Sequence, residues 1–140
     1  MGLKIIDHSE EAMRQIEQAI RRGLERCGQK AEGYAKMKCP KDTGLLQNSI
    51  THVVDGSALD YYYRADTGTA SGEYHFNAPK KDEPTVTIGT NVEYAPYIEM
   101  GHIQAKTGNY VPPKRFLEPA ATQHTAEYKD LIEKELAKLG

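Results

Sequence analysis

The stretch of residues 85–120, TVTIGTNVEYAPYIEMGHIQAKTGNYVPPKRFLEPA, constrains the fold most because its apolar period changes several times. Val86 and Ile88 alternate with threonines, as a half-buried strand requires, and the Gly-Thr-Asn of residues 89–91 favours a turn. Apolar side chains at near-helical spacing and a glycine suited to ending a helix follow: Tyr94, Tyr97, Ile98, Met100 and Gly101. The stretch therefore predicts a strand, a turn, a short helix, an irregular loop and the start of a longer helix.

An amphipathic helix is predicted to run from the N-terminal region to about Lys38. Its start is indicated by Asp7 and Glu10, which are spaced as a capping box, and its end by Pro40, which has no amide hydrogen. Three glycines inside it each cost about 1 kcal/mol relative to alanine, which indicates a bend or a close approach of another backbone. Its apolar stripe steps by three or four residues: Met13, Ile16, Ile20, Leu24, Cys27, Ala31 and Tyr34.

A second amphipathic helix is predicted to begin near Glu118 and Pro119, because proline is tolerated in a first turn. Its stripe contains Leu117, Ala121, His124, Tyr128, Leu131 or Ile132, Leu136 and Leu139. Two helices that flank a small antiparallel sheet along the sequence predict an α+β fold, with both stripes covering one sheet face. Residues 1–140 are expected to form a single domain, since the chain is long enough for one core and too short for two.

A strand is predicted over residues 45–54, LLQNSITHVV, although the mixture of side chains on its two faces makes the alternation imperfect. The preceding Asp42, Thr43 and Gly44 predict a structural turn. The first two side chains can bond neighbouring amides, and the glycine can take a positive φ.

Residues 55–83 contain tyrosines, glycines and a basic pair, and they follow neither a strand nor a helix period for long. A structureless loop of this length is uncommon inside a compact domain. We interpret it as an extended β-arm or flexible loop between two paired strands, and a solvated loop with incidental tyrosines is the open alternative. Its aromatic side chains are candidate contacts to a neighbouring subunit: Tyr61, Tyr63, Tyr74 and Phe76.

The composition favours a protein that works through interfaces. Nine Tyr stand against two Phe and no Trp, and tyrosine often lies where one end of its ring packs and the other stays wet. The formal net charge of -2 does not indicate a protein that coats nucleic acid. No apolar run approaches the roughly 20 residues that span a bilayer, and the N-terminus lacks the apolar segment of a signal peptide, so the cytoplasm is expected. Cys27 and Cys39 are expected to be free thiols.

Enzyme chemistry is suggested only by an Asp-Thr-Gly motif that occurs twice, at Asp42 and Asp66. Aspartic proteases bring two such motifs together so that two carboxyl groups share a proton. Here the residues before each motif are polar, and the copies are too close in sequence for two lobes. We therefore predict no enzyme and no catalytic residue, with a small aspartic-protease-like dimer as an alternative.

Cofactor and metal sites are not expected, because the histidines have no metal-ligand spacing and no glycine-rich phosphate loop is present. A second alternative is a DNA-binding accessory module that would use the basic pairs at residues 80–81 and 114–115.

Three blocks in order, CPKDTGLLQNSI, IGTNVEYAPYIEMG and PPKRFLEPA, resemble the minor tail-component family of long-tailed double-stranded-DNA phages and prophages. The resemblance runs from about Cys39 to Ala120. It implies a structural virion protein of the phage neck, which completes the tail or joins it to the head by forming a ring around the DNA channel. It also implies a sixfold or twelvefold homo-oligomer, with other neck, connector and tail-tube proteins as partners. DNA would pass through without sequence-specific binding.

One side of the contact between subunits is predicted on two segments of the constraining stretch. The first runs from Tyr94 to Met100 and the second from Pro112 to Leu117. The expected location is the virion neck or tail, assembled in the host cytoplasm and away from any membrane. Beside the aromatics of the arm, the predicted interface residues are Tyr94, Tyr97, Ile98, Met100, Pro113 and Phe116.

Overall fold

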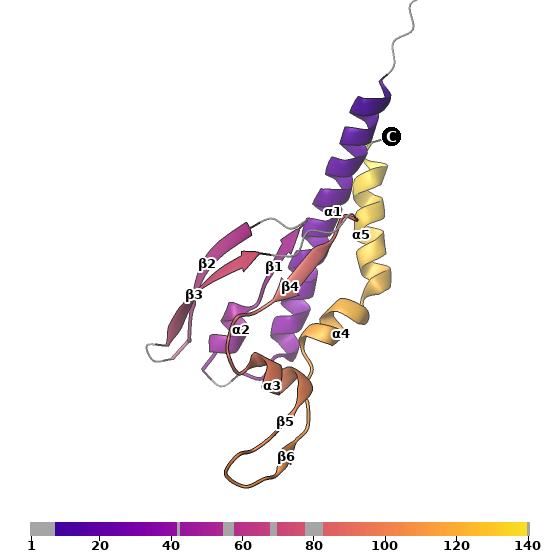
Figure 1. Cartoon of the computed structure of the whole chain (residues 1–140). Helices are drawn as coiled ribbons and strands as arrows, with labels where there is room; N and C mark the ends of the chain where they lie inside the picture. The colour runs from indigo at the N-terminus through magenta and orange to yellow at the C-terminus, as the bar shows by residue number, and fades with distance from the viewer. Residues whose placement is uncertain (1–7, 42, 55–57, 68–69, 78–82, 140) are drawn as a thin grey trace, which may run out of the picture.

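The computed structural model describes residues 8–41, 43–54, 58–67, 70–77 and 83–139 of the 140-residue chain. Its long N-terminal helix, small antiparallel sheets and C-terminal helices confirm the predicted α+β class (Figure 1). In chain order the elements are α1 (Ser9–Lys38), α2 (Leu45–Ser49), β1 (Thr51–Val54), β2 (Ala58–Arg64), β3 (Ser71–Asn77), β4 (Val86–Gly89), α3 (Ala95–Met100), β5 (His102–Ile103), β6 (Tyr110–Val111), α4 (Leu117–Thr122) and α5 (Thr125–Ala137).

The described strands form three two-stranded antiparallel sheets. Strand β1 pairs with β4, so that Thr51 lies opposite Gly89 and Val54 opposite Val86. Strands β2 and β3 form a hairpin whose sequence is inserted between β1 and β4. This confirms the predicted arm between two paired strands, and we call the β2–β3 hairpin the arm. Strands β5 and β6 form a second, much shorter hairpin.

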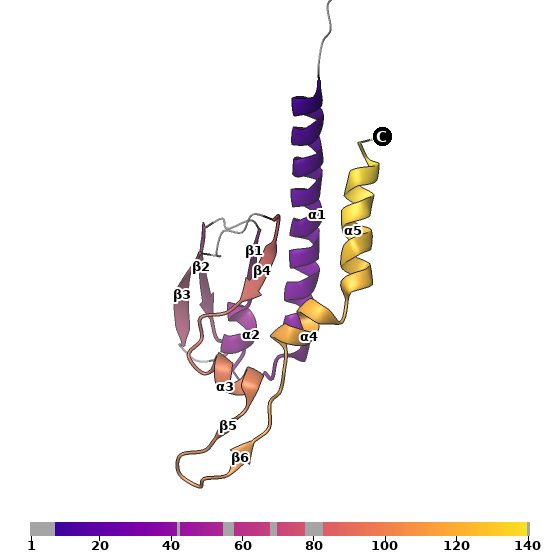
Figure 2. The same ribbon diagram turned by 45° about the vertical axis from the view of Figure 1, so that its right-hand side comes forward.

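Helix α1 is the central layer of the molecule. Both views place it between the strands and α5, and α5 runs antiparallel beside it (Figure 1, Figure 2). Helix α1 covers the β1–β4 sheet, while α4 contacts β4. Both helix stripes were expected to cover one face of the sheet. The structure differs for α5, whose stripe packs mainly on α1.

The N-terminal helix ends at Lys38, as predicted, and Cys39 is its C-cap. The predicted continuous buried stripe is wrong for residues 9–18, which are all exposed; Met13 and Ile16 are 62% and 44% accessible. The physical reason is length, since α5 has 13 residues and α1 has 30. The N-cap is His8, without a side-chain cap hydrogen bond, and the Asp7 of the predicted capping box lies outside the described residues.

Residues 45–49 are a helix, α2, so the predicted strand is wrong for its first half, and β1 begins only at Thr51. Leu46 and Ser49 are both buried, and their spacing of three places them on one face of a helical turn. Gly44 lies directly before the helix and has a positive φ of +82°, and this conformation turns the chain into α2. An imperfect alternation is compatible with either structure, and contact with the core decides in favour of the helix.

Two helices, α4 and α5, stand where one continuous C-terminal helix is predicted, so that prediction is wrong. The break lies at Gln123 and His124, and His124 has a non-helical φ of -125° and ψ of 28°. The imidazole of His124 stacks on the ring of Tyr34, with centroids 3.6 Å apart and planes 5° apart. The Tyr128 hydroxyl donates back across the break to the Ala120 carbonyl. These contacts turn the chain so that α5 can follow α1.

A close backbone approach and a buried carboxylate hold α5 against α1. A Cβ added to Gly23 would lie 2.8 Å from the Cα of Ile132, so this glycine makes the close approach that the sequence indicated. Glu135 is buried and accepts hydrogen bonds from Arg22 Nε at 3.3 Å and Arg26 Nη1 at 3.2 Å. The pairing compensates for the burial of the charge.

The core lies where the last turns of α1 meet α2, α3 and α4. Its members are mostly small, which fits the low aromatic content. Both cysteines are buried and free, as predicted. The main cluster consists of Ala35, Cys39, Leu46, Ile50, Tyr63, Val92, Ala95, Phe116 and Ala120.

Candidate functional site

Helix α3 is anchored to the body by the turn that precedes it. The Thr90 hydroxyl hydrogen-bonds the Ser49 hydroxyl of α2 and accepts the amide of Val92 at 3.2 Å. Val92 and Ala95 are buried, so one side of α3 packs on the core and the other faces outward. The short helix predicted from the apolar spacing is therefore present.

Gly101 ends α3, as its position predicted, with a φ of +79° and a ψ of 169°. This is an extended conformation at positive φ, which glycine alone adopts easily, and not the left-handed helical conformation. A Cβ at this position would lie 2.8 Å from the Val111 carbonyl oxygen and 3.0 Å from the Pro113 nitrogen. The glycine therefore lets the β5–β6 hairpin return directly beneath α3.

The Glu99 carboxylate joins α3 to the start of α4. It accepts the amides of Phe116 at 2.9 Å, Leu117 at 3.1 Å and Glu118 at 3.0 Å, which are donors that a helix start leaves unpaired. The Lys114 amide adds a bond to the Ile98 carbonyl at 2.8 Å. We call the three bonds the Glu99 cap. It was not predicted, because residues that favour capping are recognised next to a helix start and Glu99 is far from it in sequence.

A group of exposed apolar side chains lies on α3 and the β5–β6 hairpin. Their accessible fractions run from 41% to 72%. Exposed apolar side chains that gather on one surface are candidates for an interaction site, whereas scattered ones need no explanation. Two of its members, on β5 and β6, were missed because two-residue strands are too short to show an alternation. We define the α3–β6 patch as Tyr94, Tyr97, Met100, Ile103 and Tyr110.

An open pocket of about 600 Å³ adjoins this patch and shares Tyr97 and Ile103 with it. Tyr97, His102, Ile103 and Lys106 are among its lining residues. The His102 ring packs edge-on against Tyr97, with centroids 5.8 Å apart, which orients the tyrosine. The pocket is therefore an apolar recess with a cation at its edge.

The arm is held to the body by tyrosines on its inner face. The Tyr61 hydroxyl donates to the Ser49 carbonyl, and the Tyr63 hydroxyl donates to the Asn91 side chain. Tyr74 packs edge-on against Tyr61 with centroids 5.2 Å apart. Burial raises the pKa of all three phenols, so they stay neutral and able to donate.

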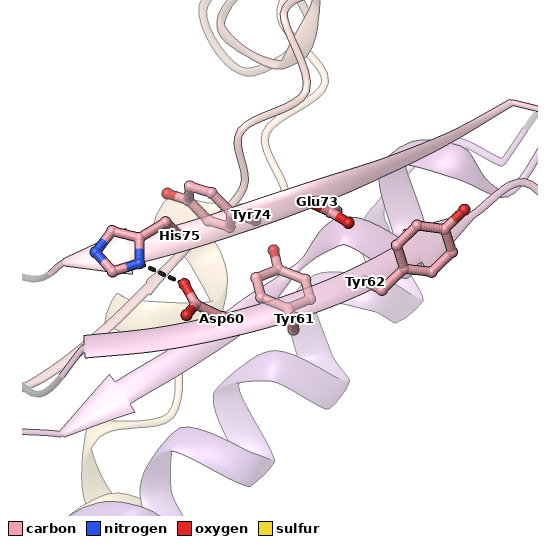
Figure 3. A pocket seen from close by; sticks show the side chains of 6 residues that line it. All are labelled: Asp60, Tyr61, Tyr62, Glu73, Tyr74 and His75. Atoms are coloured by element: carbon pink, nitrogen blue, oxygen red, sulfur yellow. Dashed lines mark hydrogen bonds and ion pairs between the residues drawn. The ribbon is translucent and has the colours of Figure 1, made fainter.

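The outer face of the arm is open. Asp60, Tyr62, Glu73 and His75 are exposed, and together with the inner Tyr61 and Tyr74 they line a shallow pocket of about 610 Å³ (Figure 3). The His75 imidazole pairs with the Asp60 carboxylate across the hairpin (Figure 3). The strand alternation thus separates an exposed outer face from an inner face that packs on the body.

The ten predicted interface residues fall into three settings. Those on the outer side of α3 are exposed, others are partly buried, and two belong to the core. The side chain of Phe76 lies outside the described part of the structure. The exposed ones are Tyr94, Tyr97 and Met100; Tyr61, Tyr74, Ile98 and Pro113 are partly buried; Tyr63 and Phe116 are buried.

The two Asp-Thr-Gly motifs approach each other in space. The Asp66 amide donates to the Thr43 carbonyl at 2.6 Å, and a Cβ at Gly44 would lie 2.6 Å from the Asp66 carboxylate. The Thr43 hydroxyl accepts the amide of Leu45 at 3.3 Å. Asp42, the other aspartate of the pair, lies outside the described residues.

The Asp66 carboxylate is ionised by its surroundings. It pairs with Lys41 Nζ at 2.6 Å and accepts from Asn48 Nδ2 at 2.8 Å. The bond from Lys41, followed by that from Asn48, lowers the pKa of Asp66. The two bonds fix the Asp66 carboxylate beside the turn that contains Thr43 and Gly44, which is a structural contact between the two motifs.

Neither metal binding nor membrane insertion finds support in the described residues. Within them, no group of three or more His, Cys, Asp or Glu side chains could hold a metal ion. No described helix combines the length and the apolar character that crossing a bilayer requires.

A comparison with protein families identifies the chain's relatives. The HK97-gp10-like family, described as "Bacteriophage HK97-gp10, putative tail-component", matches residues 4–101, which is well over half of the chain. The matched range includes α1, the arm and α3, whereas α4 and α5 lie beyond it. Searches of curated proteins and of solved structures found no significant match. The chain belongs to the HK97-gp10-like family of bacteriophage tail components.

Proposed function

We propose that this tail component is a structural protein of the virion neck, which completes the tail or joins it to the packaged head by forming a ring around the DNA channel. A ring requires one surface of each subunit to fit a different surface of the next. The observation that carries the proposal is the α3–β6 patch, an exposed apolar surface whose helix α3 is joined to the start of α4 by the Glu99 cap.

The arm is proposed to reach a neighbouring subunit or ring. Its inner tyrosines are engaged with the body of the same chain, so the face available to a neighbour is the outer one, with Tyr62, Glu73 and His75. Tyr62, at 65% accessible, is the most exposed aromatic side chain of the arm among those described. An aromatic side chain surrounded by polar groups is typical of the centre of a protein interface.

Further partners of the ring would be other neck, connector and tail-tube proteins. DNA would pass through the channel without sequence-specific binding, which agrees with a formal net charge of -2. The protein would be located in the virion neck or tail after assembly in the host cytoplasm.

Native mass spectrometry of the purified protein over a range of concentrations tests the proposal. The expected result is a discrete oligomer of six or twelve chains. Purified virions, probed with an antibody against the chain, should contain it at the neck. A chain that is absent from purified virions would contradict the proposal, whatever its oligomeric state in solution.

A further inference from the structure

The molecule is elongated, and each of its ends carries an exposed apolar surface. The N-terminal turns of α1 lie at one end and the β5–β6 hairpin lies at the other (Figure 1, Figure 2). At the hairpin end is the α3–β6 patch. At the opposite end are residues 9–18 of α1, all exposed, which we call the α1 tip.

The α1 tip carries Met13 and Ile16, spaced three apart on the helix and therefore neighbours on its surface. The C-terminal end of α5 lies toward the same end of the molecule (Figure 1), and Leu139, which follows this helix, is 40% exposed. A narrow helix with two adjacent apolar side chains has a suitable shape for the recess formed by Tyr97 and Ile103.

The recess and the α1 tip carry charges of opposite sign. Lys106 lines the recess, and no Asp or Glu is among its lining residues. The α1 tip contains three acidic side chains and one basic side chain. Its N-terminal position adds the positive end of the helix dipole, but Glu10 and Glu11 in the first turn outweigh that partial charge. The acidic side chains of the tip are Glu10, Glu11 and Glu17.

We propose that the α1 tip of one copy binds in the α3–β6 patch of the next copy, with Met13 and Ile16 against Tyr97, Ile103 and the recess between them. This inference rests on the proposed self-assembly and adds which two surfaces meet. The acidic side chains of the tip lie beside Lys106 at the edge of the contact. Because the surfaces differ and lie at opposite ends, the contact is heterologous, and it repeats until the rotation between copies closes a ring.

A mixing experiment with full-length protein tests this pairing. Met13→Asp places a charge on the α1 tip and leaves the α3–β6 patch unchanged. Ile103→Asp places a charge on the α3–β6 patch and leaves the α1 tip unchanged. Each variant alone should be monomeric, with association weakened at least tenfold, because a central apolar contact is replaced by a charge. An equal mixture should form dimers and nothing larger, since one functional surface of each kind remains.

Two further variants provide the controls. Met37 is 81% exposed on α1 outside both surfaces, so Met37→Asp should assemble like the wild type. Glu17→Lys and Lys106→Glu should each weaken association by about 2- to 5-fold, and their combination should restore part of the loss.

The pairing is overturned if the wild type is monomeric, if the mixture stays monomeric, or if either Asp variant keeps the wild-type oligomer. Another occupant of the tip would be residues 1–7 of the same chain, which include Leu3, Ile5 and Ile6. In that case Met13→Asp would lower the thermal midpoint of the monomer and leave association unchanged, which also overturns the pairing. A wild-type ring that survives both substitutions contradicts this inference alone, whereas absence from virions contradicts the proposed function.

Discussion

At the scale of single residues, the Glu99 cap gives the first prediction. Replacing Glu99 by Ala leaves three amides at the start of α4 without an acceptor. We expect the free energy of unfolding to fall by about 1–3 kcal/mol, the cost of leaving such donors unsatisfied. Urea denaturation followed by circular dichroism measures the change. Glu93→Ala, an exposed carboxylate on the turn before α3, is the matched control and should change stability by no more than about 0.5 kcal/mol. Equal effects of the two substitutions would show that the cap is not used.

His52 links β1 to α1 through two carboxylates. Its Nε2 lies 2.7 Å from Glu25 Oε1 and its Nδ1 lies 3.2 Å from Glu32 Oε1. A neutral imidazole has a single N–H, so both hydrogen bonds form only when the ring is protonated. The bond to Glu32, followed by that to Glu25, raises the pKa of His52 above its ordinary value of 6.5, although burial opposes the shift. The other charged group facing this pair is Lys36, which lies 3.3 Å from Glu32.

The stability contributed by His52 should therefore depend on pH. Because the pKa of His52 is higher in the folded protein, the contribution is complete below pH 6.5 and is lost as pH rises through the folded value. Burial would raise the pKa of Glu32, but His52 and Lys36 lower it on balance, so its contribution is lost only below 4.5. We expect the stability difference between wild type and His52→Gln to be largest between these two limits and to shrink above neutral pH. Thermal unfolding from pH 4 to pH 9 measures it, and a difference that grows with pH would refute the assignment.

At the scale of elements, α1 contains two glycines that predict opposite effects. A Cβ at Gly28 would lie 2.4 Å from the His52 ring and 2.8 Å from Val86, whereas a Cβ at Gly33 would meet nothing within 4 Å. Gly33→Ala should stabilise the protein by about 0.4–1 kcal/mol through helix propensity. Gly28→Ala should destabilise it by about 1–3 kcal/mol, since the clash exceeds the same gain. Paired thermal unfolding curves of the two variants measure the difference, and stabilisation by both would mean that α1 and β1 are less closely packed.

The elements that could be predicted from sequence are those with a sustained period or strong punctuation. Helix α1 repeats its stripe over many turns before Pro40, and β4 alternates cleanly before a turn. The break at His124 could not be predicted, because its cause is stacking on Tyr34, a residue 90 positions away in sequence. Helix α2 is a single turn, and whether such a turn is helix or strand depends on the core it meets.

The candidate site was predicted in part for the same reasons. The near-helical spacing of Tyr94, Tyr97 and Met100 placed them on one short helix, and all three are exposed. No periodic pattern around Phe116 indicates whether its side chain lies in the core or at an interface. Only the packing shows that it is buried. Ile103 and Tyr110 become part of the surface through the pairing of two very short strands, which no local pattern indicates.

At the scale of the whole molecule, Tyr97 and Phe116 separate assembly from folding. Phe116 is fully buried, so Phe116→Ala should lower the free energy of unfolding by about 3–5 kcal/mol and produce a loosely packed monomer. Tyr97 is 58% exposed, so Tyr97→Ala should leave stability within about 0.5 kcal/mol and abolish the oligomer. Unfolding curves and native mass spectrometry distinguish these outcomes. Full assembly by Tyr97→Ala would remove α3 from the proposed interface.

The Glu99 cap has a consequence for divergence among relatives. The carboxylate lies inside the family-matched range, and its three partners are backbone amides beyond that range. A backbone amide is supplied by every residue except proline, so this attachment requires one particular side chain on the matched side and none on the other. At this one attachment, residues 116–118 can therefore be replaced by any residue except proline and still offer the same three donors to Glu99.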